Sequence, residues 1–115
     1  LRWQGQHHAS LRRRVAVEPG QPYLWQVSAR GKVSGDGRVE IFLGWTDAAG
    51  NLVGPIERDC LPPGTHDWIP LSVRGTAPSR ATHAWVYAGV RHQYPSDYAE
   101  IDALTLYQLN HDSLD

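Results

Sequence analysis

Short alternations of apolar and polar side chains run along the chain, and turn residues interrupt them at intervals of roughly 8–12 positions. The alternation is clearest over residues 38–46, where one face collects Val39, Ile41, Leu43 and Trp45. A period of two is typical of a strand with one buried face. Many such strands at regular spacing indicate an all-β sandwich or barrel.

The pattern predicts six strands before the C-terminal part of the chain, at residues 11–18, 23–32, 38–46, 52–58, 68–74 and 82–91. Gly54-Pro55 interrupts the fourth of these, and Pro70 interrupts the fifth. Proline cannot donate a hydrogen bond to a strand neighbour, so we expect both strands at a sheet edge or a bulge.

The segment at residues 98–109 fits two periodicities. A helix would place Ile101 and Leu104 on one side, whereas a strand would place Asp102, Leu104 and Leu106 on one face. The segment is rich in Ile, Thr and Tyr and has no good helix cap. We therefore expect a strand.

Seven or eight strands with connections that cross between sheets predict an all-β fold, a two-sheet antiparallel β-sandwich of the jelly-roll kind. With 115 residues, the chain is long enough for one domain with a sizeable core. We expect a single domain over residues 1–110 and the start of a linker at residues 111–115.

The composition excludes several other classes of protein. Hydrophobic residues make up 41% and charged residues 20%, which is ordinary for a globular domain and unlike disordered, collagenous or coiled-coil chains. No apolar run approaches the ~18 residues of a membrane-spanning helix. One cysteine allows no internal disulfide. The chain begins at Leu1 without a signal-peptide pattern, so we expect a domain of a longer, processed protein.

The charge is small overall but unevenly distributed. A formal net charge of −1 predicts neither a nucleic-acid nor a membrane partner. Basic residues nevertheless outnumber acidic ones in residues 1–38, and they include Arg12, Arg13 and Arg14. Such a run is commonly solvated charge that protects a sheet edge. The alternative is a ligand role, which would favour an acidic polysaccharide because guanidinium groups match carboxylates.

Four segments of the chain carry a family resemblance. They read VAVEPGQPY at residues 15–23, WTDAAG at 45–50, WIPLSV at 68–73 followed by APSRA at 77–81, and EIDALTL at 100–106. In this order they resemble the motifs of jelly-roll carbohydrate-binding modules, which are attached to xylanases, cellulases and laminarinases. The resemblance covers about residues 11–107 and concerns the fold more than the ligand.

The resemblance implies a non-catalytic module that tethers an appended glycoside hydrolase or polysaccharide lyase to its polysaccharide. It implies a polysaccharide or oligosaccharide ligand, a catalytic domain in the same parent chain, no required cofactor, and a secreted or periplasmic location. The alternative is a structural β-sandwich that packs on a catalytic neighbour and binds no glycan.

The family often holds a structural calcium ion, and this chain departs from that pattern. The chain starts too late to show the usual opening strand with its N-x-x-F-E motif, and Ala103 stands where a second Asp often follows Asp102. Asp102 remains the one residue that the resemblance offers as a calcium ligand. It supplies at most two of the six to eight oxygens that calcium takes.

A small jelly-roll enzyme is a further hypothesis. Glu100-Ile101-Asp102 is similar to the start of the E-x-D-x-x-E strand of retaining β-glucanases, where carboxylates act as nucleophile and general acid. Thr105 stands at the third position, so the required pair is incomplete. A closing strand without catalysis is the simpler interpretation.

Aromatic residues point to a binding face. On the strand at residues 82–91, Ala84, Val86, Ala88 and Val90 form an apolar inward face, which sends Trp85 and Tyr87 outward. Flat rings with polar groups beside them suit a sugar, whose ring has an apolar C–H face and polar edges. The expected ligand-binding residues are Trp85, Tyr87, Phe42, Glu40, His83, Arg91 and Tyr94.

Overall fold

The described part of the molecule consists of β-strands joined by turns and loops. A computed structural model describes residues 1–109 and contains eight strands and no helix in that range. The strands are β1 (Arg2–Gln4), β2 (His8–Ala16), β3 (Pro22–Val33), β4 (Arg38–Thr46), β5 (Glu57–Cys60), β6 (Gly64–Thr76), β7 (His83–Arg91) and β8 (Tyr98–Gln108). The linker expected at residues 111–115 lies outside the described residues.

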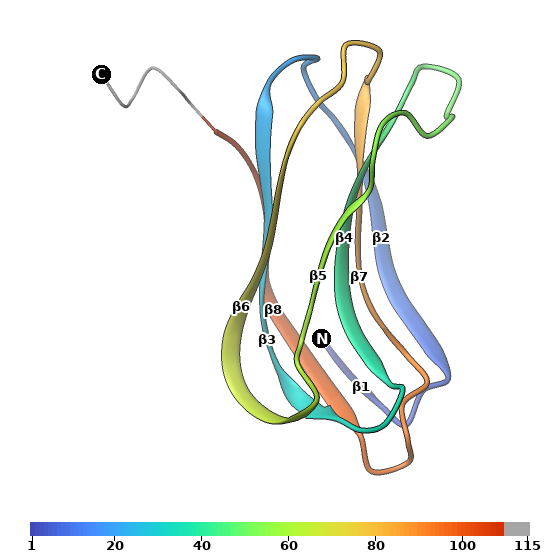
Figure 1. Ribbon diagram of the computed structural model, residues 1–115, viewed down its shortest axis with the longest axis vertical. Helices are drawn as coiled ribbons and strands as arrows, with labels where there is room; N and C mark the ends of the chain where they lie inside the picture. The colour runs from blue at the N-terminus through green and yellow to red at the C-terminus, as the bar shows by residue number, and fades with distance from the viewer. Residues whose placement is uncertain (110–115) are drawn as a thin grey trace.

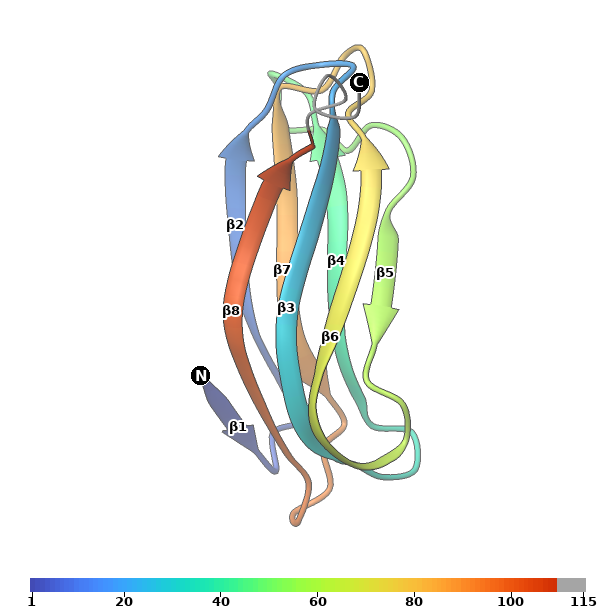
Figure 2. The same cartoon turned by 90° about the vertical axis from the view of Figure 1, so that its left-hand side faces the viewer.

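The strands form two facing sheets, so the expected two-sheet antiparallel sandwich is confirmed (Figure 1). One sheet has the order β1-β8-β3-β6 and the other the order β2-β7-β4-β5. Figure 2 shows the first sheet in front of the second, with β6 at one edge. Within residues 1–109, no helix is long and apolar enough to cross a membrane.

The core lies between the two sheets and uses the predicted inward faces. β3 contributes Tyr23, Trp25, Val27 and Ala29, all of them buried. Facing them are the alternate residues of β4 and β7 predicted to point inward, and all are buried. The indole nitrogen of Trp25 donates to the backbone carbonyl of Tyr87 over 3.1 Å, which joins the two sheets through the core.

One strand was not predicted, and several strand boundaries differ from the prediction. The structure has an N-terminal strand, β1, that pairs with β8 and that the sequence pattern did not reveal. The strand expected at residues 52–58 begins only at Glu57, because Gly54 adopts a φ of +74° and only a single bridge at Leu52 precedes it. β6 is longer than expected, and Pro70 lies on it at the sheet edge, as predicted.

The final segment is a strand, as expected, but one of its faces was assigned wrongly. Ala103 has a φ of +53°, and the register with β3 shifts at this point. An extra residue of this kind forms a β-bulge and exchanges the two faces of the strand beyond it. Ile101 is therefore buried and Leu104 is half-buried, while Asp102 is exposed instead of sharing the face of Leu104.

A buried carboxylate ties the loop between β7 and β8 to the turn before β4. Asp97 is almost fully buried and accepts hydrogen bonds from the hydroxyl and amide of Ser34, at 2.7 and 3.2 Å, and from the amide of Tyr94 at 3.2 Å. Burial alone would raise the pKa of Asp97, but these hydrogen bonds outweigh it and hold the pKa below 3.8. The ionised form is therefore part of the folded structure.

Replacing this carboxylate should weaken the fold and flatten its acid response. Because the folded pKa of Asp97 is depressed, its stabilisation is present above the unfolded pKa and is lost as pH falls through the folded pKa. We expect Asp97→Asn to lower the free energy of unfolding by about 2 kcal/mol at pH 7. Urea unfolding from pH 7 to pH 2 should show the difference from the parent shrinking below about pH 4. A constant difference across that range would contradict this assignment.

Candidate functional site

The outer face of the β2-β7-β4-β5 sheet gathers most of the predicted site residues. β4 and β7 pair without a register shift, which places Phe42 opposite Tyr87 and Gly44 opposite Trp85. Alternation then turns Glu40, His83 and Arg91 to the same side. The structure thus brings together six of the seven residues named from the sequence.

Three rings on this face pack nearly parallel to one another. The centroids of Phe42 and Tyr87 are 4.7 Å apart with an 18° angle between the ring planes. Trp85 lies 5.9 Å from Tyr87 and 6.4 Å from Phe42, at 30° and 26°. Such offset aromatic packing stabilises each ring by about 1 kcal/mol beyond its burial. The rings therefore form a rigid cluster.

Trp85 borders a hollow beside this cluster. The loop between β4 and β5 projects beyond the sheet in Figure 1, and it supplies one wall of a hollow of about 290 Å³. A Cβ built on Gly44 would lie 3.6 Å from the Trp85 ring and 3.4 Å from Ile56, so the missing side chain leaves room for both. The hollow is lined by Arg14, Thr46, Gly50, Leu52, Ile56 and Trp85.

Tyr87 points outward as predicted, but it is not an exposed platform. Only 5% of its surface is exposed, because Phe42 and Trp85 cover it and its hydroxyl reaches over Gly89. The hydroxyl lies 3.3 Å from Nε2 of His8. Burial raises the pKa of Tyr87 above 10.0, and nearby Glu40 raises it further. Tyr87 is therefore a buried packing partner of Phe42 and Trp85.

An ion pair between the buried Glu40 and the partly exposed Arg91 lies beside the aromatic cluster. Glu40 is 3% exposed. Arg91 donates two hydrogen bonds to its carboxylate, from Nε at 3.0 Å and from Nη2 at 3.2 Å. A two-pronged contact of this kind is the strongest form of a carboxylate–guanidinium pair. The pair fixes the position of both side chains; Glu40 is buried beneath it, whereas the exposed part of Arg91 keeps further N–H donors for a ligand.

His83 joins the face, but Tyr94 does not. Nδ1 of His83 accepts from the guanidinium of Arg14 at 3.5 Å and lies 2.9 Å from the hydroxyl of Thr82. Tyr94 lies in the loop between β7 and β8, packs on Gly35, and places its hydroxyl 3.3 Å from a carboxylate oxygen of Asp36. Its predicted place beside the aromatic cluster is therefore not supported.

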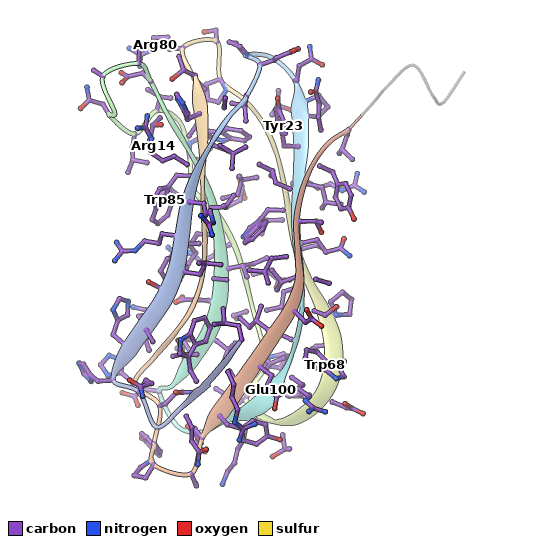
Figure 3. All side chains as sticks on the ribbon, turned by 180° about the vertical axis from the view of Figure 1, so that it is seen from behind. Arg14, Tyr23, Trp68, Arg80, Trp85 and Glu100 are labelled. Carbon is purple, nitrogen blue, oxygen red and sulfur yellow. The ribbon has the colours of Figure 1, made fainter. Side chains whose placement is uncertain are left out.

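Arginines at the margins of the cluster were not among the predicted site residues. The guanidinium carbon of Arg58, on β5, lies 4.8 Å from the ring centroid of Phe42. On β2, Arg12 pairs with Tyr87 and Arg14 with Trp85. Figure 3 shows Arg14 and Trp85 near one another on this sheet. The basic run at residues 12–14 signalled two of these positions, but no sequence pattern linked Arg58 to Phe42.

The surroundings of Asp102 do not fit a calcium ion. Its carboxylate is exposed and accepts a hydrogen bond from the next amide, that of Ala103, at 2.8 Å. In the part of the chain that the structure describes, no three His, Cys, Asp or Glu side chains come together as a metal site. Calcium takes six to eight oxygen ligands. No second carboxylate lies beside Asp102 in the described residues to supply more of them.

Glu100 is held in the wrong ionisation state for a general acid. Arg2 donates to it at 2.6 Å and Arg30 at 3.1 Å, and the hydrogen bond from Arg2 is the main reason that the pKa of Glu100 lies below 4.5. A glycosidase acid needs a raised pKa. Glu100 is therefore unsuited to the role of general acid, and Thr105 stands where the motif has its other glutamate.

A tryptophan that is more exposed than Trp85 lies on the opposite sheet. Trp68, on β6, is 42% exposed, and the guanidinium carbon of Arg30 lies 4.9 Å from its ring centroid. Figure 3 shows Trp68 and Glu100 near the lower end of that sheet, far from Trp85. Because Arg30 covers one face of Trp68, this ring is less open to a ligand than its exposure suggests.

Comparison with known proteins gives a fold likeness and no sequence relative. No protein-family model matches the chain, and no curated protein does. Among solved structures, a family 16 carbohydrate-binding module matches with a TM-score of 0.67 and 16% identity, over 93% of this chain and 74% of that one. The chain has the fold of a carbohydrate-binding module.

The same sandwich also occurs inside a larger protein. The enzymatically active domain of tailspike protein 4 from bacteriophage CBA120 matches with a TM-score of 0.67 and 17% identity. The match covers 89% of this chain and only 14% of the tailspike chain. At these identities the carbohydrate-binding-module likeness concerns the fold alone, and the ligand must be argued from the site.

The ion pair beside the cluster gives a prediction about stability. Removing Arg91 leaves the buried Glu40 carboxylate unpaired, so Arg91→Met should cost roughly 3 kcal/mol of unfolding free energy. The double variant Glu40→Gln with Arg91→Met should recover more than half of that loss, because no buried charge remains. Urea denaturation of the parent, both single variants and the double variant measures the cycle. Additive losses would show that the pair is not coupled.

Proposed function

We propose that this domain is a non-catalytic carbohydrate-binding module and that Trp85 is the ring on which a sugar stacks. The observation that carries the proposal is the position of Trp85: its ring stacks with Phe42 and Tyr87 and also lines the adjoining hollow. A flat ring beside a hollow can cover the C–H face of a pyranose, while Arg14 and Thr46 offer hydrogen bonds to its edge.

The neighbours of Trp85 have different roles in this proposal. Phe42 and Tyr87 fix the plane of the tryptophan ring by stacking, and Leu52 and Ile56 form the apolar wall of the hollow. A platform that is already ordered loses little conformational freedom when ligand arrives, which favours affinity.

The proposed role is tethering, not chemistry. A module of this kind raises the effective concentration of an attached glycoside hydrolase or polysaccharide lyase at its polysaccharide. That role requires a catalytic domain in the same parent chain and a secreted or periplasmic location, where polysaccharide is found. The absence of a second carboxylate at position 105, which is Thr105, supports the assignment as a non-enzyme.

One observation favours a second candidate, a structural sandwich that packs on a neighbouring domain. Between the edge strand β2 and the facing strand β8 lies an apolar crevice of about 180 Å³, and Val15 on its border is 38% exposed. A covering domain would bury this crevice. The crevice lies between the sheets, whereas Trp85 lies on an outer face, so the two candidates use different surfaces.

The test of the proposed function is the loss of one ring. Trp85→Ala should weaken binding to the best polysaccharide of a screen by about thirtyfold, since a buried aromatic anchor contributes about 2 kcal/mol. The same variant should cost only about 1 kcal/mol of folding stability, because part of the ring lies in solvent. Affinity electrophoresis selects the polysaccharide, and titration calorimetry with thermal unfolding measures both quantities.

Two other tryptophans serve as controls. Trp25→Ala removes a fully packed core ring and should cost about 3–5 kcal/mol of stability. Trp68→Ala removes an exposed ring from the opposite sheet and should leave affinity unchanged. If Trp68→Ala abolishes binding while Trp85→Ala does not, the binding face is on the other sheet. If no polysaccharide binds, the structural sandwich is the better interpretation.

A further inference from the structure

The outer face of the β2-β7-β4-β5 sheet is strongly positive, although the chain as a whole carries a net charge of −1. Its outward strand positions hold five arginines against a single carboxylate among residues 1–109, that of Glu40. The arginines are Arg12, Arg14, Arg38, Arg58 and Arg91.

Four of these arginines have no acidic partner in the described part of the chain, and one of the four, Arg38, donates to the backbone carbonyl of Gly37. The ion pairs found there use Arg2, Arg30 and Arg91. Arg12, Arg14 and Arg58 are exposed and lie beside the rings of Tyr87, Trp85 and Phe42 respectively. The single carboxylate of the face is already occupied by Arg91, so it cannot neutralise them.

Asp47 and Asp59, two carboxylates near the face, are engaged elsewhere, and Glu57 on β5 takes the inward-parity position opposite Leu43. Asp47, in the loop above the hollow, accepts from the amides of Ala49 and Asn51 at 2.9 and 3.0 Å. Asp59, on β5, accepts from the amide of Ser72 on the opposite sheet at 3.0 Å. The unpaired positive charge beside the rings therefore faces solvent.

We propose that the ligand is a polyuronate, a polysaccharide whose rings each carry one carboxylate. This inference rests on the proposed function, because it assigns the ligand class of the same face. A uronate ring keeps an apolar C–H face for Trp85, and its carboxylate accepts two parallel hydrogen bonds from a guanidinium group. Arg14 lies beside Trp85 and lines the same hollow, so one ring can make both contacts.

The geometry favours a polyuronate over a single-stranded nucleic acid, which also combines negative charge with flat rings. Nucleic-acid binding uses a series of open rings on which successive bases stack. Here Tyr87 is buried, and Arg58 lies over Phe42, so Trp85 is the accessible ring of the cluster. The arginines are spaced around the single accessible ring of Trp85, which suits a polymer that carries one carboxylate on each sugar.

A matched pair of polymers tests whether binding depends on the carboxylates of the polysaccharide. Polygalacturonate should bind the parent protein at least tenfold more tightly than the same polymer with its carboxylates methyl-esterified. Raising the salt concentration from about 20 mM to about 300 mM should weaken binding to polygalacturonate by roughly fivefold, because exposed charges are screened over about 10 Å at 0.1 M. Equal affinity for both polymers would overturn the polyuronate assignment and leave the proposed function intact.

Neighbouring arginines on one strand supply matched variants. Arg12 and Arg14 face outward, while Arg13 pairs with Val86 and lines the crevice between the sheets. We expect Arg12→Gln with Arg14→Gln to weaken polygalacturonate binding by about fivefold to tenfold, as two exposed ion pairs would. Arg13→Gln removes the same type of charge from the same strand and should change affinity by less than about twofold.

The remaining outcomes separate the two proposals. If Arg13→Gln weakens binding as much per charge as the outward pair does, attraction is general and the polyuronate contact is overturned. If polygalacturonate binding needs the arginines but survives Trp85→Ala, the platform of the proposed function is wrong, and this inference falls with it. Tighter binding of an oligothymidylate than of polygalacturonate would assign the face to nucleic acid instead.

Discussion

The pairing of β4 with β7 is the constraint on which the rest of the structure depends. The register runs without interruption from Arg38 opposite Arg91 to Thr46 opposite His83. A shift of one residue would exchange the two faces of either strand. The uninterrupted pairing therefore decides at once which side chains fill the core and which rings meet on the outer face.

Both faces of this strand pair set small residues beside large aromatic rings. The inward side of β7 alternates alanine and valine, whose small volumes leave room for Trp25 and Trp45 from neighbouring strands. Glycines at positions 44 and 89 do the same on the outward side, where Trp85 and Tyr87 lie over them. Large rings are accommodated on both faces because small residues stand next to them.

The sequence revealed the long strands and missed features that depend on neighbouring strands. A period of two was readable along β3, β4 and β7, because each strand is long enough to repeat it several times. The three residues of β1 are too few to show any period. The bulge at Ala103 was also unreadable, since nothing in its composition marks a positive φ.

In the candidate site, too, the sequence revealed what depends on one strand and missed what depends on its neighbours. Strand parity was enough to predict that Trp85 and Tyr87 point outward, and it was confirmed. The burial of Tyr87 was not predictable, because it depends on rings that β4 and β7 bring together across the sheet.

Arginine placement has the same origin, because Arg58 and Arg14 reach the cluster from opposite edges of the sheet. A central platform with charge at both edges is therefore a product of strand order. Strand order is a property of the fold that no local sequence window contains.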